Sequence, residues 1–320
     1  FLEDMGVEPV ETDLGEYIVQ LAGEKPYHIV TPAMHKSKKD IAQLFHEKLN
    51  YPLTDDATEL TMLARRLLRS KYVEADLGVT GANFILPNIG AIAVTENEGN
   101  ARLSTAAPKV HVAIAGIEKV LPSYETLGMF WPLLSTSGTG QKVTVYNTLF
   151  KGPRQAHEQD GPEHMYVILL DNGRTKLLAE EDKRQALSCI RCGACLNACP
   201  VYKNIGGHSY GSTYQGPIGS IITPHLDGME KFKHLSFASS LCGACTEVCP
   251  VKINIHEILL LNRKQSVEEG YTERSERLMM KMWNYSMKRR WTMNMVSGKT
   301  KNIFLKKFFA NLWGDKRTFP

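Results

Sequence analysis

The chain has 320 residues, of which 43% are hydrophobic and 22% charged, and its formal net charge is +4. That length favours about two domains. No stretch approaches the ~18 consecutive apolar residues of a membrane-spanning helix, which excludes an integral membrane protein. The acidic start has no initiating Met and no charged-then-apolar signal pattern. We therefore expect no export, and we expect that an earlier part of the first domain is missing.

The first half of the chain predicts an α/β domain. Short β-rich runs at residues 16–22 and 27–33 predict two strands, and helical spacing predicts helices at 38–49 and 54–76. Further strand-like runs follow at residues 76–86, 89–96, 110–116, 142–149 and 164–171. Several are apolar on both faces, which is typical of a sheet packed between helices. Turn signals between the first two of these runs predict a hairpin-like excursion.

Glycine-rich stretches in this domain do not have the spacing of nucleotide-binding motifs. In the run 135–144, Gln141 separates Gly140 from Lys142, and Val143 follows, so the phosphate-loop pattern is absent. No predicted strand leads into G-x-G-x-x-G, which argues against a dinucleotide site. The turn at 95–105 is polar and lies beside a predicted strand end, where ligands often bind. The alternative to a ligand-binding turn is a solvated turn in which Gly99 adopts a positive φ.

All seven cysteines lie between residues 189 and 249. An odd number in so short a segment is a poor disulfide framework and favours thiolates on metal in the reducing cytoplasm. The first four have the C-x2-C-x2-C-x3-C-P spacing of bacterial ferredoxins: Cys189, Cys192, Cys195 and Cys199. A zinc site would leave three of the seven thiolates without a role, so iron–sulfur clusters are the better hypothesis.

Residues 239–251 repeat residues 189–201 with identity at seven of thirteen positions, but Ser239 stands where the first copy has Cys189. In the ligand exchange of ferredoxins, each motif lends its last cysteine to the other cluster. The predicted ligands are then Cys189, Cys192, Cys195 and Cys249 for the first cluster, and Cys199, Cys242 and Cys245 for the second. Three outcomes stay open for the second: Ser239 supplies an oxygen ligand, another group or solvent does, or the site is [3Fe-4S]. A structural alternative is that Ser239 caps the helix carrying this motif.

The rest of the chain predicts packing and a basic tail. Four side chains between the two motifs either line an electron or substrate route or, as we favour, pack the small domain: His208, Tyr210, Tyr214 and His225. Residues 256–270 predict a closing helix. From residue 271 onward, 12 Lys and Arg oppose 3 Asp and Glu, a net charge of +9. The amphipathic run 299–313 there predicts either peripheral contact with an anionic membrane or docking on protein.

Three stretches together carry a family resemblance: residues 81–122, 186–220 and 241–260. They resemble the lactate utilisation protein B family, the iron–sulfur subunit of a three-protein bacterial system that oxidises L-lactate to pyruvate. The resemblance implies an isomerase/coenzyme A transferase-like α/β domain followed by an α-helical ferredoxin-like domain with two [4Fe-4S] clusters. The expected boundaries are 1–175 for the α/β domain, 176–268 for the two-cluster domain and 269–320 for the tail.

The expected function is electron transfer in L-lactate oxidation, one electron per cluster, toward an acceptor chain. Expected partners are the other subunits and an acceptor for which quinone is a candidate; we expect no nucleic acid. The alternative is a self-sufficient oxidoreductase of a related organic acid, with its active site in the α/β domain. Catalytic residues are unknown, because no flavin or nicotinamide motif is visible. A carboxylate substrate could bind Asn100, Arg102 and Ser104, and loss of a lactate-dependent thermal shift in Arg102→Ala would support this.

Overall fold

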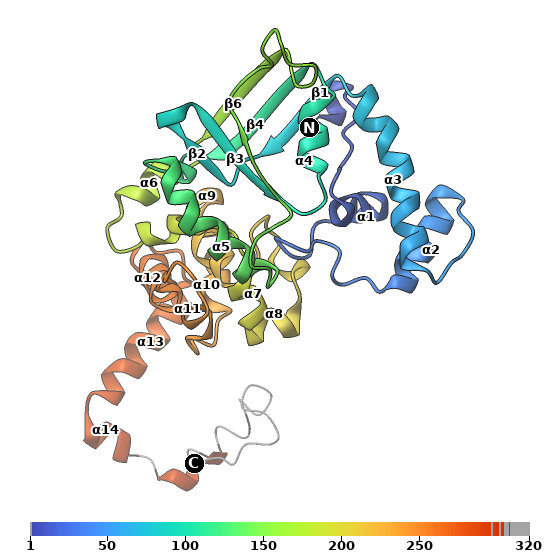
Figure 1. The fold of residues 1–320 in the computed structure, drawn as a ribbon. Coiled ribbons are helices and arrows are strands. Elements are labelled where there is room, and N and C mark those ends of the chain that lie inside the picture. Colours follow the sequence, from blue (N-terminus) through green and yellow to red (C-terminus); the bar gives the residue numbers. More distant parts are fainter. Residues whose placement is uncertain (1, 296, 301, 304–306, 308–320) are drawn as a thin grey trace. The chain divides into compact units, whose positions relative to one another are not determined.

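The computed structural model describes residues 2–295, 297–300, 302, 303 and 307. The chain divides into two compact units, Phe1–Arg263 and Lys264–Pro320. The first unit contains both the α/β domain and the cysteine-rich domain, and Figure 1 shows the sheets of the former and the short helices of the latter. All features of the candidate site lie in this first unit.

Three helices form the N-terminal part of the first unit: α1 (Leu14–Ala22), α2 (Lys38–Leu49) and α3 (Ala57–Glu74). Their apolar faces share one core that includes Ile18, Phe45 and Leu63. The predicted helix at 38–49 is confirmed, and the Ser37 side chain and Asp40 form a capping box at its start. The predicted helix at 54–76 is confirmed as well, with slightly narrower bounds.

The two N-terminal strand predictions are wrong. Residues 16–22 belong to α1, because the Asp13 side chain accepts the Gly15 N–H as an N-cap and the apolar side chains pack along one helical face. Residues 27–33 form no regular element. They belong to an irregular segment, residues 24–36, which we call the strap. Its backbone carbonyls bond to side chains of the cysteine-rich domain instead of to a neighbouring strand.

Two three-stranded sheets follow in the α/β domain. The strands β1 (Leu77–Gly81), β4 (Val110–Gly116) and β6 (His164–Leu170) pair in parallel in the order β1-β4-β6. The antiparallel sheet has the order β2-β3-β5 and comprises β2 (Phe84–Leu86), β3 (Ala91–Glu96) and β5 (Tyr146–Phe150). The predicted hairpin-like excursion is confirmed, since β2 and β3 pair through a turn ending at Gly90.

The faces of the parallel sheet differ in burial. On one face the helix α4 (Asn100–Ala106) packs so closely that a Cβ on Gly78 would lie 1.8 Å from the Ser104 carbonyl oxygen. On the other face Val79, Ile114 and Ile168 are 46%, 41% and 48% exposed. The expectation of a sheet covered on both sides therefore needs correction: within the described residues, no element buries this second face.

The cysteine-rich domain is helical. Its elements are α6 (Arg174–Ala179), α7 (Ala194–Ala198), α8 (Pro200–Ile205), α9 (Gly216–Asp227), α10 (Met229–Phe237), α11 (Ala244–Glu247) and α12 (Ile255–Glu268), the last matching the predicted closing helix. Its core includes Ile221 and Leu259 together with the buried Cys195, Cys245 and Cys249. Tyr210 is also buried in this core, in line with the packing role that we favoured for it. The α5 helix (Leu127–Gly138) of the preceding domain belongs to a core shared with Cys192.

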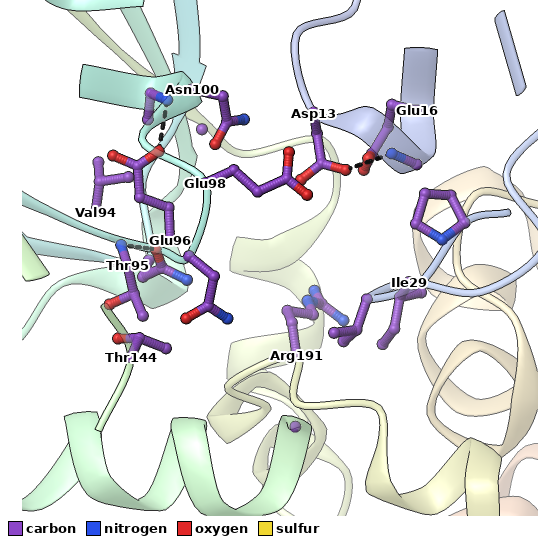
Figure 2. Close-up of a pocket in the computed structure, with 18 of the residues that line it drawn as sticks. Asp13, Glu16, Ile29, Val94, Thr95, Glu96, Glu98, Asn100, Thr144 and Arg191 are labelled. Carbon is purple, nitrogen blue, oxygen red and sulfur yellow. Dashed lines mark hydrogen bonds between the residues drawn. The ribbon is translucent and has the colours of Figure 1, made fainter. Parts of the chain in front are cut away.

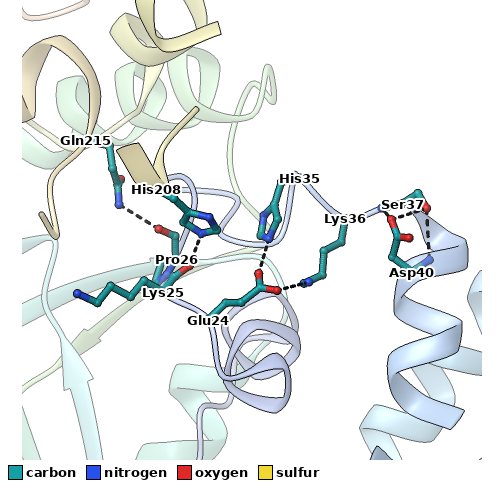
Figure 3. Close-up of polar contacts among 9 residues, drawn as sticks. All are labelled: Glu24, Lys25, Pro26, His35, Lys36, Ser37, Asp40, His208 and Gln215. Carbon is teal, nitrogen blue, oxygen red and sulfur yellow. Dashed lines mark hydrogen bonds and ion pairs between the residues drawn. The ribbon is translucent and has the colours of Figure 1, made fainter. Parts of the chain in front are cut away.

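The strap joins the N-terminal helices to the cysteine-rich domain (Figure 3). Three consecutive strap carbonyls accept hydrogen bonds: Lys25 O from His208 Nε2 at 2.8 Å, Pro26 O from Gln215 Nε2 at 3.0 Å, and Tyr27 O from the Tyr202 hydroxyl at 2.7 Å. Within the strap, Glu24 pairs with both His35 and Lys36, as Figure 3 also shows. The strap thereby lies against the first cysteine loop and contributes to the pocket beside it.

The second unit contains the helices α13 (Arg274–Met287) and α14 (Arg290–Asn294). Several large apolar side chains of α13 are exposed, among them Met282 and Trp283 at 63% and 59%. In the described part of the chain, no helix is both long and apolar enough to span a membrane. Most of the predicted amphipathic run at 299–313 lies outside the described residues.

Candidate metal centre and adjoining pocket

The two cysteine loops share one backbone conformation. Arg191 and Gly193 in the first loop have φ values of 65° and 76°, and their counterparts Leu241 and Gly243 have 54° and 83°. Such left-handed residues turn successive N–H groups toward a common centre and make an anion-binding concavity. At Gly193 there is also no room for a side chain, because a Cβ would lie 2.8 Å from Cε1 of the buried His28. The sequence repeat is thus a structural repeat.

The first group of cysteines combines both motifs. Cys189, Cys192, Cys195 and Cys249 line one small cavity, closed by apolar neighbours such as Ile218 and Ile253. Burial raises the pKa of the Cys192 thiol, and the nearby Cys189 and Cys249 thiols raise it further. The last cysteine of the second motif therefore lies with the first three cysteines of the first motif.

The second group shows the reciprocal exchange. Burial raises the pKa of the Cys245 thiol, and the charges of Cys199 and Cys242 also raise it. Cys199 comes from the first motif, so the three thiols predicted for the second cluster lie within electrostatic range of one another. Cys242 is exposed, whereas Cys245 is buried. The second group therefore reaches the protein surface at Cys242, whereas the first group has three buried cysteines and one, Cys189, that is partly exposed.

Ser239 repeats the backbone interaction of its counterpart Cys189. The Cys189 Sγ accepts the Arg191 N–H at 3.4 Å, and the Ser239 Oγ accepts the Leu241 N–H at 3.2 Å. The hydroxyl thus has the same local partner as the thiol it replaces. The helix-capping alternative is wrong, because α11 begins after Gly243, which is its N-cap.

These donor sets fit iron–sulfur clusters. Burial raises the pKa of the Cys192, Cys195 and Cys245 thiols. Burial alone would therefore leave these three thiols uncharged. Metal ions reverse this balance, because a coordinating thiol is deprotonated by the positive charge of the metal. Several thiols converging on one apolar cavity, with inward N–H groups at the loops, match the needs of a cluster whose sulfurs accept hydrogen bonds.

A pocket of about 800 Å³ adjoins the first group (Figure 2). Four parts of the chain line it: α1 with the strap, the ends of β1 and β3 with α4, the end of α5 with Thr144, and the loop residues Ile190, Arg191 and Cys192. Cys192 lines both this pocket and the cysteine cavity, as do Ile190 and Ile29. A molecule in the pocket would therefore lie next to a residue of the first cysteine group.

The structure brings two of the three predicted substrate residues to this pocket. Asn100 and Ser104 line it from α4, but Arg102 is not among the lining residues. The Arg102 guanidinium lies instead over the Tyr146 ring, 5.0 Å from its centroid. The polar turn at 95–105 comprises the end of β3, a short turn and most of α4. Gly99 has the positive φ of the alternative interpretation, 80°, and the Glu96 carboxylate accepts the Ala101 N–H.

Sequence reasoning missed Arg191, Asp13 and Glu16 as pocket residues. Figure 2 shows the Arg191 side chain pointing from the cysteine loop into the pocket, opposite Asp13 and Glu98. Burial raises the pKa of Glu16 to about 9, and a hydrogen bond with Asp13 and the Asp13 charge act in the same direction. Burial and Asp13 likewise raise the pKa of Glu98. The only sequence signal for these pocket residues was the arginine between Cys189 and Cys192.

Comparison with known proteins agrees with the two-domain reading. The LUD domain family matches residues 2–170, and the 4Fe-4S dicluster domain family matches residues 185–253. Lactate utilization protein B of Shouchella clausii is 49% identical over 281 residues, which cover 88% of this chain and 59% of that protein. The proteins of the same name from Bacillus velezensis and Bacillus thuringiensis are 44% and 46% identical over the whole chain.

The chain belongs to the lactate utilization protein B family. It spans 59% of the length of the Shouchella clausii relative and 69% of the two Bacillus relatives. No solved structure matches the chain. Because the dicluster domain covers both cysteine motifs, this member of the family carries two iron–sulfur clusters. The α/β domain is its LUD domain, and the isomerase/coenzyme A transferase-like and ferredoxin-like fold names remain predictions.

Proposed function

We propose that this chain is the iron–sulfur electron-transfer subunit of a system that oxidises L-lactate to pyruvate. The observation that carries the proposal is the exchange of cysteines between the motifs, which builds two metal sites next to each other in one small domain. The family adds the substrate, since the relatives are named for lactate utilization. Partners in this proposal are the other subunits of the system and an electron acceptor.

The proposed ligands are Cys189, Cys192, Cys195 and Cys249 for the first cluster, and Cys199, Cys242, Cys245 and Ser239 for the second. For Ser239 the support is its Oγ, which accepts the same backbone N–H as the Cys189 Sγ in the other loop. An oxygen ligand is harder than a thiolate, so it would set the second cluster apart from the first. The two repeats would then differ in reduction potential.

The arrangement suggests a direction for the electrons. Lactate releases two electrons on oxidation, and each bound cluster carries one, so the pair lets them leave singly. The first cysteine group is mostly buried and shares Cys192 with the pocket. The second group reaches the surface at Cys242. We assign the pocket side to the electron donor and the Cys242 side to the acceptor.

We also propose that the chain works at the cytoplasmic face of the membrane, with a quinone-linked acceptor. Its support is the +9 charge after residue 270 and the exposed apolar side chains of α13, Met282 and Trp283 among them. Basic and apolar groups together favour anionic lipid surfaces. Sedimentation with vesicles containing anionic lipid, compared with neutral vesicles, tests this contact; equal recovery in both would contradict it.

The test of the main proposal is reduction of the anaerobically purified protein, followed by low-temperature EPR. We expect about eight irons per chain, reduction by L-lactate when the other subunits are present, and faster reduction by dithionite in either case. Zinc in place of iron, or clusters that lactate and the other subunits never reduce, would reject the proposal. Lactate reduction of the isolated chain would instead favour the self-sufficient oxidoreductase.

The ligand assignment has its own test in Ser239→Ala and Ser239→Cys. The alanine variant removes the oxygen and should lose one iron of the second cluster, seen as a [3Fe-4S] EPR signal in the oxidised protein. The cysteine variant should keep all irons and change the Mössbauer parameters of one iron site. If the unchanged protein already shows the [3Fe-4S] signal, Ser239 is not a ligand.

A further inference from the structure

Arg191 is held in an unusual backbone conformation beside the pocket. Its φ of 65° lies in the left-handed region, which residues other than glycine, asparagine and aspartate seldom adopt. The counterpart Leu241 has the same backbone shape, so the conformation belongs to the loop. The positive charge is not common to both loops, because only the loop that borders the pocket has an arginine at this position.

The guanidinium of Arg191 is only partly paired. Its Nη2 donates to the Glu118 Oε1 at 3.3 Å, but Glu118 lies closer to Arg174, with 2.7 Å between Oε2 and Nε. One face of the guanidinium stacks on the Tyr214 ring, 4.1 Å from the centroid. Its Nη1 is buried and has no hydrogen-bond partner among the described residues. One carboxylate therefore serves two arginines, and one guanidinium nitrogen remains unpaired.

The opposite wall of the pocket is polar and acidic. Asp13 and Glu98 face Arg191 across the pocket, and Asn100 lies beside them (Figure 2). The Glu98 Oε2 accepts the Leu14 N–H, which fixes this side chain at the start of α1. Such a wall repels an anionic group but accepts hydrogen bonds from a hydroxyl. The two ends of the pocket thus prefer different ends of one ligand.

We propose that this pocket binds a small organic acid, with Arg191 pairing its carboxylate and the Glu98 wall facing its hydroxyl or oxo end. A planar guanidinium with free N–H groups matches a carboxylate in geometry and charge. That the acid is a 2-hydroxy or 2-oxo acid rests on the proposed function. The pocket exceeds a three-carbon acid in volume, so water or a longer chain shares the space. Because Cys192 lines the same pocket, the acid lies beside the first cysteine group.

Titration calorimetry on the anaerobically purified protein tests the inference with L-lactate, pyruvate and lactamide as probes. Lactamide keeps the hydroxyl and the size of lactate but has no carboxylate. We expect lactate and pyruvate to bind, and lactamide to bind at least about tenfold more weakly, because the charged partner of Arg191 is missing. Equal binding of lactate and lactamide would overturn the proposal without any variant.

Two variants then locate the anchor. Arg191→Gln should weaken lactate binding about tenfold or more, and Arg191→Lys should recover part of it, since lysine keeps the charge but not the fork. Arg102→Gln is the matched comparison, because Arg102 stacks on Tyr146 outside the lining. Loss of binding in Arg102→Gln with Arg191→Gln unaffected would place the acid at the other arginine and reject this site.

Iron content and EPR spectra of every variant separate this inference from the proposed function. If Arg191→Gln keeps its irons but shifts the cluster potential and leaves lactate affinity unchanged, Arg191 only balances cluster charge and the pocket proposal fails. If lactate binds through Arg191 but never reduces the clusters in the presence of the other subunits, the site stands and the electron-transfer proposal fails.

Discussion

At the residue scale, the pocket contains carboxyl groups whose environments differ sharply. Glu16 is partly buried against Asp13, and the two carboxyl groups share a hydrogen bond. Glu96, which lines the pocket from the end of β3, has both oxygens occupied by the Ala101 and Arg102 N–H groups. The Glu96 carboxylate thus caps the start of α4, whereas the Glu16 carboxyl is kept protonated by its surroundings.

Glu16→Gln should change how stability depends on pH. The folded-state pKa of about 9 lies above the ordinary 4.5, so between these values the folded chain holds a proton that the unfolded chain has released. Wild-type stability should therefore fall as pH rises through this window, by at most about 1.4 kcal/mol per pH unit. Glutamine does not titrate, so the variant should lose less stability over the same pH range. Melting temperatures of both proteins from pH 5 to 8.5 test this, and parallel curves would contradict it.

At the element scale, close packing between β1 and α4 positions one wall of the pocket. Gly78 in β1 leaves room for the Ser104 carbonyl of α4, and Ser104 and Asn100 on that helix line the pocket. Gly81, at the end of the same strand, has open space where a Cβ would lie. The two glycines are therefore a natural pair for comparison.

Gly78→Ala should destabilise the LUD domain by about 1–3 kcal/mol, because the added methyl group overlaps backbone and α4 must shift. Gly81→Ala should change stability by no more than about 0.5 kcal/mol. Thermal unfolding of the two variants measures the difference, and iron content should stay the same in both. Equal melting temperatures would contradict this prediction and show that α4 can shift without loss of stability.

At the scale of the whole first unit, the strap connects the N-terminal helices to the cysteine-rich domain. It is held by Tyr202, His208 and Gln215, and it places Ile29 in the lining of both the pocket and the cysteine cavity. Tyr202 is buried, so its bond to the Tyr27 carbonyl is shielded from water. The strap is thus a direct link between the cavity for the first cluster and the helices at the start of the chain.

Tyr202→Phe should loosen the strap locally. Removing the hydroxyl leaves the Tyr27 carbonyl without this partner and should cost about 1–2 kcal/mol of local stability. Hydrogen exchange of residues 24–36 should become faster, while exchange in α9 stays as it was. Tyr210→Phe is the control, since the three strap carbonyls accept from Tyr202, His208 and Gln215 and not from Tyr210. Unchanged exchange in Tyr202→Phe would mean that the other two bonds suffice.

Much of the metal site could be predicted from sequence, because its information is local. The C-x2-C-x2-C-x3-C-P spacing sets the loop geometry within a few residues, and the repeat shows where Ser239 replaces a cysteine. Helix α2 was predicted with its bounds for the same reason, since its capping box and apolar spacing are both short-range. Residues 16–22 were misassigned, because short apolar runs do not distinguish a strand from a buried helix.

The sequence by itself determined the class of cofactor, the cysteines available to it and the family. Only the tertiary structure decided what meets at the pocket, because its walls come from segments far apart in the chain. Nothing in the sequence around Arg191 distinguishes it from other residues between two cysteines, and Asp13, Glu98 and Asn100 lie 178, 93 and 91 residues before it. Their meeting depends on the strap and on the packing of α4, which no local pattern encodes.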